Sequence, residues 1–261
     1  MATDRRAEIV EAFGRQARMF ARSALHRDEE RLRRLVDRVA PEAGERGLDV
    51  ACGPGLVARA LAARGARVVG ADLTMEMLLQ ADDAGDGRDA PGEGSGIDRV
   101  RAEAGRLPFR DGAFDFVVCR NAFHHFLDPP AVLREVARVT RRAGRVVIED
   151  MVAPEDLIDR DEHEVIERLR DRAHVRTLTP REFHCLLEQT GLGPTEETEF
   201  EMRIDFDEWM DRAFPPPAAK ERARQLMQDG LTAPRGGRRV FLEEGRLKFA
   251  RLSRLLVAAR P

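Results

Sequence analysis

Two glycines and one later aspartate are the residues whose types and spacing best suit ligand binding. Gly53 and Gly55 follow an apolar run in 48-LDVACGPGLVARAL-61, and Asp72 closes the next apolar run. Glycines let backbone N–H groups come close to a ligand, and a carboxylate can accept both hydroxyls of a ribose. At the carboxyl ends of parallel strands these groups would form a nucleoside-binding crevice. Taken singly, the glycines could form only a tight turn, and Asp72 could cap a helix.

The elements that would position these residues alternate along the chain. Helical patterns at 55–65, 74–84 and 128–141 lie between successive strand patterns. Apolar runs typical of strands occupy about 48–51, 66–72, 99–104, 114–120, 144–150, 196–206 and 253–260. Such alternation predicts an α/β fold with a Rossmann-like, doubly wound, mainly parallel seven-stranded sheet.

The chain length of 261 residues favours one domain with an elaborated end. Residues 82–99 are rich in Gly, Asp and Pro and should form a mobile loop, and 235-RGGRR-239 should form a flexible one. We expect a helical N-terminal arm at 1–45, a ligand-binding core at 46–151, helical insertions with the sixth strand at 152–246, and the last strand at 247–261.

Composition excludes several classes of protein. The 44 basic and 47 acidic residues leave a net charge of −3, which argues against a nucleic-acid binder. The three cysteines show no paired spacing, which indicates a reduced compartment and no zinc site. With no signal-peptide pattern and no membrane-spanning apolar run, we expect a soluble cytoplasmic protein. The sequence does not choose between a monomer and a homodimer.

Four blocks of sequence together resemble a known family. They are 48-LDVACGPG-55, 69-VGADLTMEML-78, 103-EAGRLPFRDGAFDFVVCRNAFHHFLDP-129 and 135-EVARVTRRAGRVVIED-150. The sequence is similar to the class I S-adenosylmethionine-dependent methyltransferases, most closely the branch of the ubiquinone/menaquinone C-methyltransferases. The resemblance covers most of the chain from about residue 10.

The resemblance implies a site for S-adenosylmethionine, with S-adenosylhomocysteine as product. Asp49, Ala51, Gly53 and Gly55 would surround the methionine end, Asp72 and Leu73 the ribose, Glu103 and Ala104 the adenine, and Arg120 or Asn121 the methyl group. Three positions depart from the family pattern. Ala51 replaces the usual first glycine and could crowd the cofactor, Glu103 replaces the commoner aspartate, and 142-RAG-144 replaces Pro-Gly-Gly.

Candidates for contact with the methyl acceptor follow the fourth and fifth strands. Methyl transfer from a sulfonium is an in-line displacement, so a base is needed only where the acceptor loses a proton. His125 and His174 are the catalytic candidates, although His125 could instead pack or cap a helix. Because neighbouring side chains point apart and no third ligand recurs, His124 and His125 predict no metal site.

Further acceptor-binding candidates are His124, Asp150, Arg170, Arg176, Phe13, Phe20 and Trp209. The segment 170-RDRAHVRTLTPREF-183 resembles a family block whose arginines could bind an anionic or enolic group, or could form a solvated helix. The three aromatic residues could form an apolar lid or ordinary core. Asp128 with the two following prolines predicts a helix N-cap.

These features predict methyl transfer from S-adenosylmethionine to a small, apolar or aromatic acceptor. The alternative is an S-adenosylmethionine-binding protein with a non-methylating or regulatory role, which Ala51 and the altered 142-RAG-144 segment suggest. A nicotinamide dehydrogenase is a third reading, but the loop lacks the third glycine of G-x-G-x-x-G.

Overall fold

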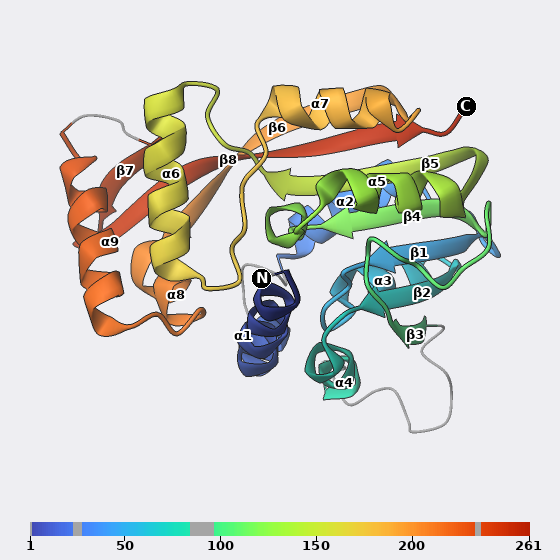
Figure 1. Cartoon of the computed structure of the whole chain (residues 1–261), viewed down its shortest axis with the longest axis horizontal. Helices are drawn as coiled ribbons and strands as arrows, with labels where there is room; N and C mark the ends of the chain where they lie inside the picture. The colour runs from blue at the N-terminus through green and yellow to red at the C-terminus, as the bar shows by residue number, and fades with distance from the viewer. Residues whose placement is uncertain (1, 23–27, 84–96, 233–235) are drawn as a thin grey trace.

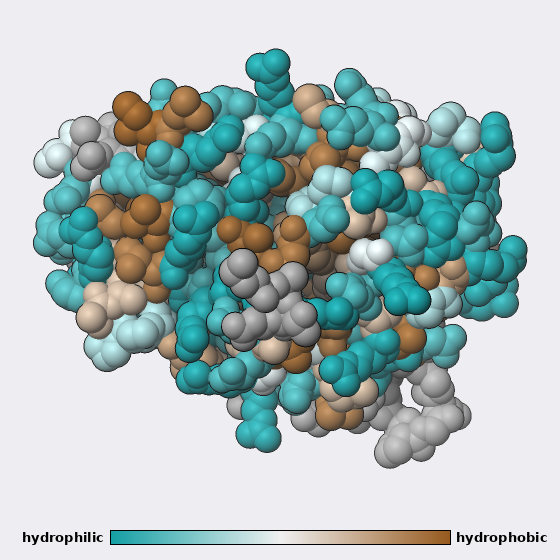
Figure 2. Space-filling view, in the orientation of Figure 1, coloured by the Kyte–Doolittle hydropathy of each residue, from teal (hydrophilic) through white to brown (hydrophobic). Residues whose placement is uncertain are grey.

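The computed structural model describes residues 2–22, 28–83, 97–232 and 236–261. Most of the predicted loop at 82–99 lies outside these residues, as does position 235 of the predicted loop 235–239. Among the described residues, none of the helices combines the length and the apolar character needed to span a bilayer. The face drawn in Figure 2 is largely hydrophilic and is broken by several apolar patches.

One sheet runs through the whole molecule (Figure 1) in the order β3-β2-β1-β4-β5-β8-β6, and β7 pairs with β8. β1 to β5 are parallel, whereas β8 is antiparallel to β5, β6 and β7. The strands are β1 (Arg46–Val50), β2 (Arg67–Asp72), β3 (Ile97–Arg101), β4 (Phe114–Arg120), β5 (Thr140–Met151), β6 (Gly193–Asp205), β7 (Arg238–Glu243) and β8 (Arg246–Ala259). The chain reverses its winding between β1 and β4, and ligands of such sheets bind at that switch point.

The helices are α1 (Ala2–Arg22), α2 (Glu29–Val39), α3 (Leu56–Ala62), α4 (Met75–Asp83), the 3-10 turn η1 (Phe123–His125), α5 (Pro129–Val139), α6 (Leu157–Arg170), α7 (Pro180–Gln189), α8 (Phe206–Asp211) and α9 (Pro217–Asp229). Several begin where the sequence supplies a cap. Asp128 accepts a hydrogen bond from Ala131 N before α5, as predicted, and Thr179 forms a capping box with Glu182 before α7.

Alternation along the strands places helices on both faces of the sheet. In β4, Val117 packs in a core with α5 and α7, whereas its neighbours Phe116 and Val118 pack with α2 and α3. The predicted doubly wound α/β fold is therefore confirmed. A third core joins α6, α8 and α9 to the outer parts of β6 and β8, at the left of Figure 1.

The structure corrects two details of the predicted sheet. Over the described residues the sheet has eight strands instead of seven, because Arg238 and Arg239 of the predicted flexible loop begin β7. Arg238 is buried and forms an ion pair with Glu167. In the sequence its charge predicts exposure to solvent, but Glu167 neutralises that charge inside the protein. β5 also begins earlier than predicted, at Thr140, and takes in the Arg-Ala-Gly segment with Ala143 at φ 55°.

Candidate functional site

A cavity of about 370 Å³ lies at the carboxyl ends of β1, β2 and β4. All the predicted cofactor residues line it except Gly55, which belongs to the same loop. α1 supplies Arg6, Ile9, Phe13 and Phe20 to the lining. In Figure 1, α1 lies between the parallel strands β1 and β2 on one side and the helices α6, α8 and α9 on the other.

The loop after β1 turns through left-handed backbone conformations. The φ angles are 56° at Ala51, 53° at Gly53 and 74° at Gly55. Glycine adopts these angles freely, but a Cβ makes them costly by about 1–2 kcal/mol. Ala51 therefore holds a strained conformation in the position where the family pattern has glycine.

Asp72 ties the glycine loop to the end of β2. Its carboxylate accepts hydrogen bonds from Gly53 N and Thr74 N, each 2.8 Å long. Burial raises the pKa of Asp72 against the lowering effect of these N–H groups. Each carboxylate oxygen has a second lone pair, so Asp72 can hold the loop and still accept hydrogen bonds from a ligand in the cavity.

Asp49 lies on the cavity floor at the end of β1 and accepts a hydrogen bond of 3.0 Å from Ala58 N of α3. Burial raises the pKa of Asp49 to about 7, although the Ala58 N–H lowers it. The side chain is therefore poised to change charge when a cation enters the cavity.

Glu103 and Ala104 line the cavity beyond β3. The carboxylate of Glu103 forms an ion pair of 2.7 Å with Arg6 of α1, and both side chains are partly exposed. A surface pair of this kind contributes about 0–1 kcal/mol, so it leaves Glu103 free to exchange Arg6 for a ligand.

The end of β4 forms another wall of the cavity. Arg120 lies 3.2 Å from Glu149, which also pairs with Arg31 at 2.6 Å. Asn121 follows with φ 53°, and its N–H donates to Glu149 O. Non-glycine residues in this conformation often mark functional positions, and Asn121 faces the cavity.

The far end of the cavity is apolar around one imidazole. His125 lines it together with Phe13, Phe20 and Phe126. The rings of Phe13 and His125 meet edge to face with centroids 4.7 Å apart, and Phe13 also contacts Phe20 at 5.9 Å. Two of the three aromatic residues predicted to form a lid, Phe13 and Phe20, thus line the cavity.

His124 and Asp150 do not line this cavity. His124 belongs to η1, and Asp150 forms hydrogen bonds to that turn. Asp150 accepts hydrogen bonds from His124 Nδ1 at 2.7 Å, Phe123 N at 2.6 Å and Met151 N at 2.7 Å. Burial alone would raise the pKa of Asp150, but His124 and the N–H groups hold it below its ordinary value. The two residues therefore position His125 instead of contacting a ligand themselves.

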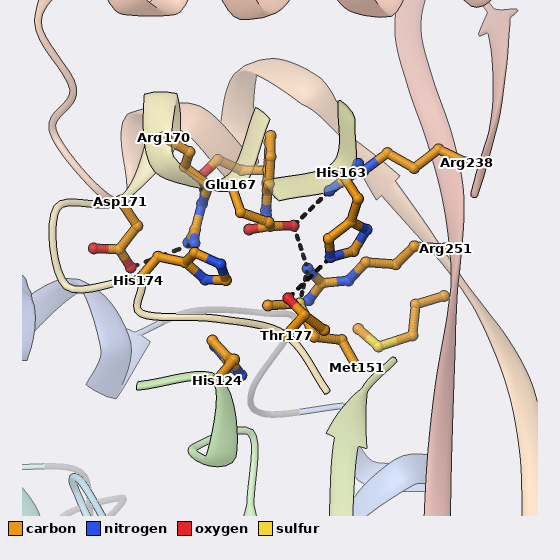
Figure 3. A network of polar contacts seen from close by, with 12 residues as sticks. His124, Met151, His163, Glu167, Arg170, Asp171, His174, Thr177, Arg238 and Arg251 are labelled. Carbon is orange, nitrogen blue, oxygen red and sulfur yellow. Dashed lines mark hydrogen bonds and ion pairs between the residues drawn. The ribbon is translucent and has the colours of Figure 1, made fainter. Parts of the chain in front are cut away.

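His174 and Arg170, also predicted as site residues, belong to a buried polar network beside the cavity (Figure 3). His174 Nε2 lies 3.1 Å from Glu164, and Arg170 Nη1 lies 3.5 Å from Asp171. Neither residue lines the cavity: Arg170 is the last residue of α6 and its Nε donates to Trp209 O, whereas His174 follows that helix and contacts Glu164 within it. The network continues through Glu167 to Arg238 and Arg251.

Trp209 and Arg176 are likewise placed outside the cavity. Trp209 is buried in the outer core against Phe249, with ring centroids 5.0 Å apart, so it is no part of a lid over the ligand. Arg176 pairs with Glu182 at 2.6 Å beside a separate, shallower pocket formed with α5 and α7. The sequence around Trp209 and Arg176 predicts helices and charged residues. It does not show which surface of the protein these two side chains face.

Comparison with known proteins decides the family. Residues 48–148 match the family described as Methyltransferase domain. The uncharacterized methyltransferase YcgJ of Bacillus subtilis is 30% identical over 82% of this chain and 82% of its own length. The chain belongs to the class I methyltransferases.

Other relatives agree with this membership. A solved structure described as a methyltransferase from Bacillus halodurans C-125 has a TM-score of 0.79 and 29% identity, covering 88% of this chain and 98% of that chain. Demethylmenaquinone methyltransferase of Clavibacter sepedonicus is 41% identical over 44% of this chain and 45% of its own length. The resemblance inferred from the four sequence blocks is confirmed.

Some lining residues of this methyltransferase were missed in the sequence. Among them are Arg6 and Ile9 of α1, Met77 of α4 and Phe126. Met77 and Phe126 lie inside the family blocks and could have been found from their neighbours. Arg6 carries no local signal, because only the packing of α1 brings it to Glu103.

Proposed function

We propose that this methyltransferase transfers a methyl group from S-adenosylmethionine to a small, apolar or aromatic acceptor by in-line displacement. One observation carries the proposal: a single cavity joins the Asp72 carboxylate and the left-handed glycine loop at one end to an apolar, aromatic end around His125. Acceptors of quinone type, as the name of the Clavibacter relative indicates for that protein, would suit such an end.

The residues present fit this cofactor. Asp72 retains lone pairs for the ribose hydroxyls, and Asp49 offers a carboxylate to the cationic methionine end. Gly53, at φ 53°, has no Cβ between its backbone and the cavity. Glu103 and the Ala104 backbone would hold the adenine.

The chain's own contribution is alignment. S-adenosylmethionine, when bound, supplies a methyl group on a sulfonium whose departure leaves a neutral thioether. The protein needs to hold the acceptor in line and exclude water, which Phe13 and Phe20 of α1 and Phe126 would do from the apolar end.

A calorimetric titration tests the cofactor assignment. Wild type, Asp72→Ala and the matched control Asp98→Ala, on the exposed neighbouring strand β3, receive S-adenosylmethionine under one buffer. Asp72→Ala should weaken binding at least about 100-fold, since charged acceptors contribute about 1.5–3 kcal/mol per hydrogen bond, whereas the control should bind like wild type.

Turnover is then measured with methyl-labelled cofactor and cell extracts. Transfer of label to a small molecule supports the proposal. A folded wild type that does not bind the cofactor contradicts it. Tight binding with no label transferred from any extract would favour the regulatory alternative, for which the strained Ala51 is the structural motive.

A further inference from the structure

A second cavity, of about 250 Å³, lies between α5 and α7. The two helices share a core and lie side by side in Figure 1. The residues that line this cavity are Pro129, Pro130, Arg176, Arg181, Glu182, Cys185 and Leu186. None of these seven residues lines the larger cavity, so the proposed cofactor site leaves them without a role.

The α5 side of this second cavity presents proline rings and no free N–H group. Helix N-termini usually attract anions, because their first four N–H groups have no partner within the helix. Here Pro129 and Pro130 have no N–H at all. Ala131 N and Val132 N both donate to Asp128, at 2.9 Å to its side chain and at 3.2 Å to its backbone oxygen. This wall therefore suits the apolar body of a ligand and not its charge.

The α7 side carries the positive charge. Arg176 and Arg181 line the cavity together with the carboxylate of Glu182. Glu182 is already engaged, because it accepts from Arg176 Nη1 at 2.6 Å and from Thr179 N at 2.8 Å. Burial raises the pKa of Glu182, but the Thr179 N–H and Arg176 bring it below its ordinary value. The carboxylate therefore stays ionised and neutralises one arginine.

Arg181 supplies the charge that is left over. Its backbone N donates to Glu155 at 3.0 Å, but among the described residues none forms an ion pair or a hydrogen bond with its exposed guanidinium. The planar fork of a guanidinium matches a carboxylate. Leu186 adds apolar surface to the same lining. The cavity thus combines an apolar wall with one unpaired cation.

The second cavity shares a wall with the acceptor end of the larger one. Its two prolines stand between residues 126–128 and 131–132, which line the larger cavity. Arg176 N donates to His124 O at 3.2 Å, and the neighbouring His125 lines the apolar end of the larger cavity. A ligand held against the prolines and Arg176 therefore touches the segments that position the acceptor end.

We propose that the cavity between α5 and α7 is a second binding site, for a small carboxylate with an apolar body, and that its occupation changes the acceptor end. The carboxylate pairs with Arg181 and Arg176, and the body packs on the prolines and Leu186. Pockets for drug-sized ligands measure about 300–1,000 Å³, so this ligand is smaller. The site itself is independent of the function proposed above, and only its effect on an acceptor rests on that function.

The thiol of Cys185 reports occupation, because it is exposed and lines the cavity. Its alkylation by iodoacetamide is followed by mass spectrometry in the presence of 1-naphthoate, 1-naphthamide or acetate. 1-Naphthoate should slow the reaction saturably. The amide lacks the charge and acetate lacks the apolar body, so each should protect at least about fivefold more weakly, as expected for the loss of one exposed ion pair or of the ring contacts.

Variants locate the site. Arg181→Gln should raise the 1-naphthoate concentration for half protection about fivefold, and Arg181→Lys, which keeps the charge, should raise it less. Arg134→Gln, exposed on α5 and outside both cavities, is the control and should behave like wild type. Each variant is compared with its own rate without ligand, since nearby arginines also affect thiol reactivity. Equal protection by the amide, no protection by 1-naphthoate, or an unchanged curve for Arg181→Gln would overturn the site.

The effect on the acceptor end is read from the ¹⁵N signals of the His125 ring, assigned by their absence from His125→Gln. These signals should shift over the same range of 1-naphthoate concentration as Cys185 protection, and over the higher range in Arg181→Gln. Constant signals, or a shift over a different range, would refute the coupling. Neither readout requires the cofactor. Calorimetry with S-adenosylmethionine on the same preparation therefore tests the proposed function separately.

Discussion

The two ends of the cavity are built in different ways. The cofactor end uses strand termini and turns close together in the sequence, such as Gly53 N on Asp72. The acceptor end joins distant segments: Gln16 of α1 reaches Asp171, 155 positions away, and Arg5 reaches the carbonyl of His174, 169 positions away. The end formed by backbone groups can stay the same when side chains are substituted. The end formed by side chains of distant elements can then come to bind a different ligand.

The largest expected effect comes from breaking the support of the acceptor end. Glu164→Ala leaves Thr177 N and His174 Nε2 without their acceptor. Since each buried unpaired group costs about 1–3 kcal/mol, we expect a loss of about 3 kcal/mol in the free energy of unfolding, measured by denaturant titration.

Calorimetry of folded Glu164→Ala should give a cofactor affinity within about twofold of the wild-type value. Substitutions at well-separated sites change free energies independently, and Glu164 does not line the cavity. Asp161→Ala, on the exposed side of the same helix, is the control and should change neither quantity. If Glu164→Ala lost as much free energy of cofactor binding as free energy of unfolding, the two ends of the cavity would not be independent.

A second effect should appear only at the cofactor end. The pKa of Asp49 is about 7, so below pH 7 the free protein carries a proton there. A cationic ligand favours the carboxylate, so binding should release that proton and tighten as pH rises to 7. The apparent affinity should fall about 10-fold from pH 8 to pH 6.

Calorimetry in buffers of different ionisation enthalpy measures that proton. Asp49→Asn should bind the cofactor with little pH dependence and release no proton. If the variant keeps the wild-type pH profile, another group is responsible and Asp49 does not contact the ligand.

Phe13→Leu should affect only the acceptor end, and modestly. It removes the edge-to-face contact with His125, worth about 0.5–1.5 kcal/mol, while keeping an apolar side chain. The KM for the acceptor should rise several-fold with cofactor affinity unchanged. Trp209→Leu is the comparison: it should lower stability without altering KM, because Trp209 lies in the outer core.

The smallest effect should come from Ala51→Gly. Glycine relieves the strain at φ 56° and removes a methyl group from the cavity lining, at some cost in chain entropy. We expect cofactor affinity to rise by about 1 kcal/mol or less, measured by calorimetry. Ala143→Gly, at φ 55° in the first part of β5 and outside the cavity lining, should leave affinity unchanged. A weaker-binding Ala51→Gly would mean that the alanine methyl contacts the ligand favourably.

The fold was predictable where local pattern and burial agree. Alternating apolar strands and capped helices gave the parallel core, and Asp128 behaved as the N-cap that its following prolines indicate. β7 was not predicted, because its paired arginines look like solvent-exposed residues until Glu167 is placed beside Arg238.

The sequence by itself determined the backbone of the proposed cofactor end, because its glycines fall where φ is positive and its carboxylate falls at the next strand end, where it accepts from Gly53 N. Only the tertiary structure decided which of His124, His125 and His174 meets the cavity. Those side chains are of one type, and their roles depend on contacts with Asp150, the Ala173 carbonyl and Glu164 that local spacing cannot encode. Backbone geometry depends on residues that are neighbours in the sequence. The direction of a side chain depends on the residues that the fold packs against it.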